Sequence, residues 1–133
     1  MVPAPAIFLD VDGVLNCAHS TKTTADAKAA AAALEPTALA ALGCLVAATG
    51  AEVVLSSDWR RDPLLVAELA RVLEPHDVRI ASCTPERRAT QPLRPIEIRE
   101  WLEAHGGLRR CWVALDDRRL QEEEGGELMR GHC

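Results

Sequence analysis

Two carboxylates one residue apart, Asp10 and Asp12, close an apolar run near the start of the chain and are followed by Gly13. The apolar residues Ala6 to Leu9 predict a buried strand. Side chains two positions apart on an extended strand point the same way, so both carboxylates leave the carboxyl end of this strand together. That end of an open parallel sheet is where ligands bind. The pair therefore marks a candidate site at one edge of a predicted sheet.

The two carboxylates also indicate the chemistry of such a site. Two like charges held this close need a cation or a shared proton. Hard cations such as Mg2+ take carboxylate oxygens. The pattern indicates metal-assisted chemistry, in which one carboxylate is the nucleophile and the other the acid or base. The alternative is a solvated Asp-x-Asp-Gly turn after an edge strand, which leaves the polar residues at later strand ends unexplained.

Polar residues end two further apolar runs. Ser56 follows the run Val53 to Leu55, and a hydroxyl there can donate to a phosphoryl oxygen without adding charge. The alternative is a Ser-Ser-Asp turn that caps the next helix, since Ser and Asp are common in turns. Asp116 and Asp117 follow the run Trp112 to Leu115. Two acidic pairs at separate strand ends favour a shared site over an Asp-Asp helix cap.

The elements that must position these residues alternate between strand and helix, which predicts an α/β fold with a parallel sheet and crossover helices. Pro36 fits the first turn of a helix, Gly50 its C-terminal cap, and Asp62 an N-cap. Polar loops are expected over 17–24 and 85–92, and the acidic stretch 122–126 is expected to be exposed. The expected strands are 6–9, 52–55, 78–82 and 112–115, and the expected helices are 25–34, 36–48, 63–73 and 95–104.

Length and composition predict one small domain with a single core, spanning 1–133. The formal charge of −5 argues against a protein that coats nucleic acid nonspecifically, although it permits a local basic patch. Five widely spaced cysteines without a Cys-x-x-Cys pair favour a reducing, cytoplasmic compartment over a zinc site or a disulfide framework. No signal peptide or membrane-spanning run is recognisable, so no membrane partner is expected.

Taken together, these motifs resemble the haloacid dehalogenase (HAD) superfamily, over about Ile7 to Asp117. Its first motif is four apolar residues followed by Asp-x-Asp-Gly, and its second is a Ser or Thr at the next strand end. Arg94 stands where the family places a basic residue, more often lysine, and Asp116-Asp117 resembles the fourth motif. The runs 12–16, 56–60 and 112–117 also resemble the small HAD domains associated with RNA-repair (Swiss Army Knife) proteins.

The resemblance implies a three-layer Rossmann-like core, with helices on both faces of the sheet, and a Mg2+-dependent phosphatase. Asp10 would attack phosphorus to form an aspartyl-phosphate, and Asp12 would act as acid and then base. Ser56 and Arg94 would hold the phosphoryl oxygens, with Arg87, Arg88 and Arg99 as rivals for the basic role. Mg2+ would be held by Asp10, the backbone carbonyl of Asp12, and Asp116, with Asp117 acting through water or on Arg94. Further substrate contacts are expected from Ser57, Gly13 and Arg60.

The same resemblance bears on the substrate. The stretches after Asp12 and between Cys83 and Arg94 are too short for a cap domain, so an open site is expected. In this family an open site goes with macromolecular substrates such as a nucleic acid end or a phosphoprotein. The alternatives are attack by Asp10 on carbon, a small-metabolite phosphatase, or a non-enzymatic binding module that keeps the fold. Asp12 disfavours the first, because phosphatases need that acid.

Several residues receive simpler predictions. Trp59, Trp101 and Trp112 are expected to be core residues rather than base-stacking platforms. The histidines share no ligand spacing, although His19 could touch substrate. The short tail after the fourth motif leads us to expect a thinly protected sheet edge near Trp112 to Leu115, covered by a partner chain or left by truncation.

Overall fold

The computed structural model describes residues 2–16, 26–86 and 93–132. Its four strands pair in parallel, in the order β3-β2-β1-β4. Because β1 lies at the centre, its carboxyl end is flanked by the ends of β2 and β4, and the predicted parallel α/β sheet is confirmed. The strands are β1 (Ala6–Leu9), β2 (Glu52–Leu55), β3 (Ile80–Cys83) and β4 (Trp112–Leu115).

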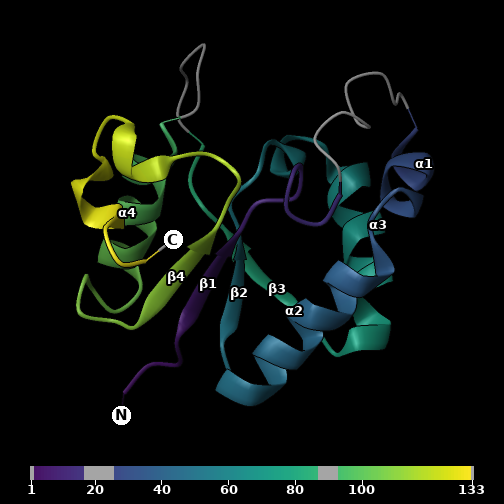
Figure 1. Cartoon of the computed structure of the whole chain (residues 1–133), viewed down its shortest axis with the longest axis horizontal. Helices are drawn as coiled ribbons and strands as arrows, with labels where there is room; N and C mark the ends of the chain where they lie inside the picture. The colour runs from purple at the N-terminus through teal and green to yellow at the C-terminus, as the bar shows by residue number, and fades with distance from the viewer. Residues whose placement is uncertain (1, 17–25, 87–92, 133) are drawn as a thin grey trace.

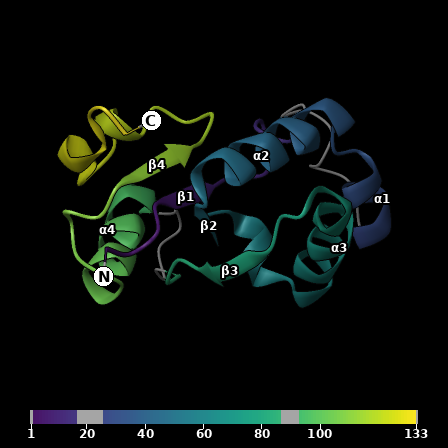
Figure 2. The ribbon, with the colours of Figure 1, turned by 90° about the horizontal axis from the view of Figure 1, so that it is seen from below.

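Helices cover both faces of this sheet (Figure 1). One face is packed by α1, α2 and α3, and the other by α4 together with the C-terminal segment, so the expected three layers are present (Figure 2). The described ranges hold no cap domain. The helices are α1 (Ala27–Ala32), α2 (Pro36–Thr49), α3 (Pro63–Leu73) and α4 (Arg94–Ala104), and short 3-10 turns are η1 (Asp58–Arg61), η2 (Glu74–His76), η3 (Leu120–Glu122) and η4 (Gly126–Met129).

Alternation along the central strand explains the two layers of core. Leu9 of β1 belongs to the cluster that includes Trp59, whereas Phe8 belongs to the cluster with Trp101 and Trp112. Phe8 meets both of these indoles edge to face, at centroid distances of 5.3 and 5.7 Å. The prediction that the three tryptophans are core residues is confirmed, because each is at most 6% exposed.

Two predicted helix ends, the start of α3 and the end of α2, are confirmed, and both are set by a capping residue. The Asp62 carboxylate accepts a hydrogen bond from the Leu64 N–H and so caps α3, and Gly50 ends α2 with a φ of 66°. The third strand is shifted: it begins at Ile80 rather than Val78, because the chain turns through the left-handed residue Asp77 after η2 and its pairing with β2 starts only at Ile80. The predicted loops 17–24 and 85–92 lie largely outside the described residues.

The C-terminal segment covers more of the sheet than the sequence predicted. The Ala114 N–H of edge strand β4 donates to the His132 carbonyl at 2.6 Å, and the His132 ring stacks on Trp112 with centroids 4.0 Å apart. Leu120 and Met129, from η3 and η4, are buried in the core beside α4. The chain's own residues therefore cover part of the edge that was expected to lie bare.

The acidic stretch 122–126 is exposed as predicted at Glu122, Glu124 and Gly125, but not at Glu123 and Gly126. Glu123 is half-buried and pairs with the Arg118 guanidinium through both carboxylate oxygens. Gly126 is buried, because its Cα packs against the backbone of Leu120 and Gln121, where a side chain would overlap them. A run of Glu residues predicts a solvated loop. The sequence did not indicate that Arg118 would pair with Glu123.

Candidate active site

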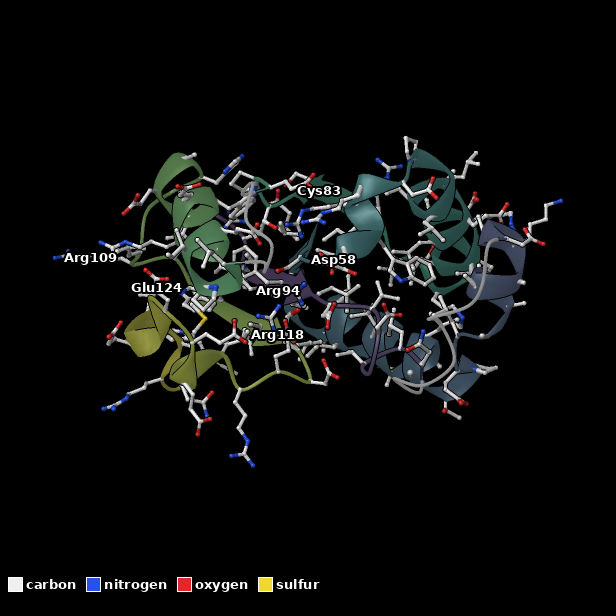
Figure 3. All side chains as sticks on the ribbon, turned by 90° about the horizontal axis from the view of Figure 1, so that it is seen from above. Asp58, Cys83, Arg94, Arg109, Arg118 and Glu124 are labelled. Atoms are coloured by element: carbon white, nitrogen blue, oxygen red, sulfur yellow. The ribbon has the colours of Figure 1, made fainter. Side chains whose placement is uncertain are left out.

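Continuation of the sheet hydrogen bonds brings the candidate residues together. The Asp10 N–H donates to the Leu115 carbonyl at 2.9 Å, and the Ser56 N–H donates to the Leu9 carbonyl at 2.8 Å. The residues that follow β1, β2 and β4 therefore begin from one edge of the sheet. This is the carboxyl end of the strands, which Figure 3 views from above, with Arg94, Arg118 and Asp58 labelled near its centre.

Three carboxylates meet at this edge. Asp10, Asp116 and Asp117 each offer an oxygen, and these oxygens lie within 4.8 Å of one another. Asp10 is only 5% exposed and Asp116 is half-buried, whereas Asp117 is exposed. Hard oxygen donors gathered at this spacing fit a divalent cation such as Mg2+. The carboxylate of Asp12 is not part of this group.

Arg94 supplies the positive charge that faces this cluster. Its Nη1 lies 3.2 Å from Asp10 Oδ1 and 2.9 Å from Asp116 Oδ2, and its side chain is 3% exposed. Asp58, which is mostly exposed, lies 3.9 Å from Nη2. Arg94 begins α4, one residue earlier than the predicted start at Pro95. Three carboxylates and one guanidinium, if all ionised, leave two negative charges for a divalent cation to balance.

Burial and these neighbours shift two pKa values. The pKa of Asp10 is raised from 3.8 to about 7, mainly because burial disfavours the charged carboxylate; Arg94 opposes this rise and the Asp116 carboxylate adds to it. Desolvation alone would lower the pKa of the Arg94 guanidinium, but the Asp10 and Asp116 carboxylates outweigh it, so that pKa is raised. Arg94 therefore stays charged beside a carboxyl whose ionisation is costly when no cation is present.

This shift predicts a pH dependence of stability in the metal-free protein. The folded-state pKa of Asp10 lies above its unfolded value, so its contribution to stability is full below about pH 4 and is lost as pH rises through about 7. We compare the free energies of unfolding of Asp10→Asn and the wild type. As pH rises from about 5.5 to 8, the value for Asp10→Asn should increase by about 2 kcal/mol relative to that of the wild type. Urea unfolding in EDTA measures this difference. Parallel pH profiles for the two proteins would contradict it, and the exposed Asp62→Asn is the matched control.

The two serines after β2 have different surroundings. Ser56 is 1% exposed, and its buried Oγ has no hydrogen-bond partner among the described residues. An unpartnered buried hydroxyl at this edge is available to a ligand. The Ser57 Oγ accepts from the Trp59 N–H at 3.2 Å and caps η1. The cap of this turn is therefore Ser57, whereas the Ser56 hydroxyl has no partner within the part of the chain that the structure describes.

Gly13 and Arg60, both expected to contact substrate, have structural surroundings. Gly13 has a φ of 81°, and a Cβ there would overlap the Asp117 carboxylate. Arg60 donates from Nη1 to the Ser57 carbonyl at 2.9 Å and from Nη2 to Glu97 Oε2 at 2.9 Å, with both charged side chains at most 3% exposed. Gly13 thus allows the close approach of Asp117 and Arg60 braces the turn after β2, and the contact of either residue with substrate stays a prediction.

The structure adds residues that the sequence did not single out for the site. Asn16 Nδ2 and Trp59 Nε1 both donate to the Asp12 carboxylate, and Glu97 braces Arg60. Asn16 is four residues from Asp12, a spacing that could have indicated contact, but Trp59 is 47 positions away. Of the rivals to Arg94, Arg99 pairs with Glu103 on the exposed side of α4. Arg87, Arg88 and His19 lie outside the described residues.

The fold and site define a class: a Rossmann-like α/β domain with a carboxylate cluster and a buried arginine at the carboxyl edge of its parallel sheet. The model of the family "HAD domain in Swiss Army Knife RNA repair proteins" matches residues 6–133, and the chain belongs to this family. Membership points to a hydrolase of phosphatase type, and the acidic cluster is compatible with the divalent metal that HAD domains use. No curated protein matches the sequence.

Within the described ranges, no helix is both long enough and apolar enough to cross a membrane. The cysteines at 44, 83 and 111 are exposed and free of disulfides.

Proposed function

We propose that this domain is a Mg2+-dependent phosphatase that hydrolyses a phosphate monoester at a nucleic acid end through an aspartyl-phosphate intermediate. The observation that carries this proposal is the juxtaposition of a buried carboxylate, Asp10, with the buried Arg94 and the unpartnered Ser56 hydroxyl. A nucleophile beside a fixed cation and a neutral donor suits attack on phosphorus, because charge on the phosphoryl oxygens needs both kinds of partner.

The chain's own residues account for both steps. Asp10 forms a bond to phosphorus while the bond to the leaving oxygen breaks, and Asp12 gives that oxygen a proton. Asp12 then takes a proton from water, whose oxygen attacks the same phosphorus and releases phosphate and free Asp10. Arg94 and Ser56 hold the phosphoryl oxygens throughout.

The carboxylates of Asp10, Asp116 and Asp117, with the backbone carbonyl of Asp12, would hold the metal. Bound there, Mg2+ would offset the repulsion among the carboxylates and stabilise negative charge on the phosphoryl group.

The substrate class follows from two observations. The family is named for RNA-repair proteins, and the described residues carry no cap over the site. Both favour a phosphate at the end of a polynucleotide over a small metabolite that a closed site would enclose. The cytoplasmic location expected from the sequence stays a prediction.

The test is release of inorganic phosphate from a panel of substrates in Mg2+. The panel contains RNA and DNA oligonucleotides with a 5′- or a 3′-terminal phosphate, the matching mononucleotides and an aryl phosphate, with Asp10→Asn as background. We expect kcat/KM for one terminal phosphate to exceed that of its mononucleotide by about tenfold, or about 1.4 kcal/mol of added binding in the transition state. Release from no monoester rejects the phosphatase. Equal rates on mononucleotide and oligonucleotide reject the polynucleotide end.

A further inference from the structure

One oxygen of the Asp12 carboxylate is held by two separate donors. Trp59 Nε1 lies 3.2 Å from Asp12 Oδ1, and Asn16 Nδ2 lies 3.1 Å from the same oxygen. Among the described residues, every hydrogen bond to this carboxylate reaches Oδ1. The other oxygen, Oδ2, is therefore the one left to exchange a proton.

Both donors are themselves fixed. Trp59 is 3% exposed and packs in the core between the sheet and α3. Asn16 is 6% exposed, and its Oδ1 accepts the Gly13 N–H at 2.9 Å. With its carbonyl oxygen used in that way, the Asn16 amide must turn its NH2 group toward Asp12. Neither donor can follow a rotating carboxylate without breaking other contacts.

A fixed acid matters because proton transfer needs alignment. An aspartate side chain turns about two bonds, and most of its orientations would point a proton away from a leaving oxygen. Two N–H donors on Oδ1 select one orientation and occupy the acceptor sites of that oxygen. Preorganised groups of this kind avoid the cost of reorganisation in the transition state.

We propose that Trp59 and Asn16 are positioning residues that orient the Asp12 carboxyl group, so that Oδ2 serves the leaving oxygen. This inference rests on the proposed function, because it assumes that Asp12 is the general acid. In this proposal both residues act through Asp12 rather than on the substrate, so their effect is confined to steps in which Asp12 moves a proton.

That confinement gives a test based on the leaving group. The 2,4-dinitrophenolate leaves phosphorus without a proton, whereas an alkoxide needs one. Since kcat/KM reports the steps up to formation of the phosphoenzyme, the acid matters for an alkyl phosphate but not for the dinitrophenyl ester. For Trp59→Phe, we expect kcat/KM to fall about tenfold on 2-phenylethyl phosphate and less than about twofold on 2,4-dinitrophenyl phosphate. The tenfold loss is a part of the about 10²- to 10⁴-fold acceleration that a positioned general acid supplies. The ratio of the two values does not depend on the fraction of enzyme that is folded.

Trp101→Phe is the matched control. Trp101 is 2% exposed, and its Nε1 donates to Ser82 Oγ at 2.8 Å, away from Asp12. This variant loses the same kind of buried indole hydrogen bond and should leave the substrate ratio unchanged. Asn16→Asp is the second variant, because it keeps an acceptor for the Gly13 N–H while replacing the amide donor. It should reproduce the selective loss on the alkyl ester even if Trp59→Phe does not fold.

Each failure has its own signature. Equal losses on both substrates in Trp59→Phe and Asn16→Asp would overturn the positioning role and leave the phosphatase intact. Asp12→Asn sets the reference and should show the largest selective loss on the alkyl ester. A nonselective Asp12→Asn would reject Asp12 as the acid, and a wild type inactive on both esters would reject the proposed function itself.

Discussion

Asp10→Asn should lower kcat by at least about three orders of magnitude, because an amide cannot form the covalent bond to phosphorus on which the proposed reaction depends. The fold should persist, since the change is nearly isosteric and removes a charge whose burial raises the pKa of Asp10 to about 7. Phosphate release under saturating substrate measures the loss, and far-UV circular dichroism checks the fold.

The control for this variant is Asp62→Asn, the same change at an exposed helix cap on α3, where Asn also caps well. It should keep wild-type turnover. Retention of more than about a tenth of wild-type turnover by Asp10→Asn would reject Asp10 as the nucleophile, since variants that lose a covalent nucleophile lose far more.

Removal of the metal should have an effect of similar size. In excess EDTA we expect turnover to fall by at least about 10³-fold, because the clustered carboxylates of Asp10, Asp116 and Asp117 then repel one another and an incoming phosphate. Mg2+ should restore activity. Ca2+ should compete without restoring it, since its larger and looser coordination displaces the attacking carboxylate.

Binding itself supplies a readout that does not depend on turnover. Mg2+ should raise the melting temperature of the wild type by mass action, and more so at pH 8 than at pH 5.5, where the Asp10 carboxyl holds a proton. Asp116→Asn should lose most of this shift. Full activity in EDTA, or a melting temperature that Mg2+ leaves unchanged, would contradict the metal assignment.

The sequence predicts the parts of this fold that are set locally. Asp62, Pro63 and Gly50 specify helix ends through capping and fixed φ, and those ends fall where expected. The apolar runs before Asp10, Ser56 and Asp116 specify three strands, which become neighbours in the sheet. The edge strand β3 lacks a clean alternation and follows an unforeseen left-handed residue, so its start was misplaced.

Contacts between distant segments account for what the sequence could not predict. The indole N–H of Trp59 reaches Asp12 only because η1 follows β2 and the Asp12 loop follows β1, and these two parallel strands are neighbours in the sheet. Arg60 looks like an exposed arginine in a polar turn, yet Glu97 of α4 neutralises it in the interior. The C-terminal tail looks too short to protect β4, yet a single residue, His132, engages that edge. In each case the partner lies on an element whose position depends on the whole fold.

The Arg60–Glu97 ion pair also constrains how this sequence can vary. It joins the turn that follows Ser56 to the helix that begins with Arg94, so two halves of the candidate site share one buried pair of charges. Loss of either partner alone would strand the other charge, at a cost of about 3–5 kcal/mol, whereas joint replacement by apolar residues of similar volume is often neutral. Substitutions at these two positions should therefore be inherited together, as a correlated pair that links segments 37 residues apart.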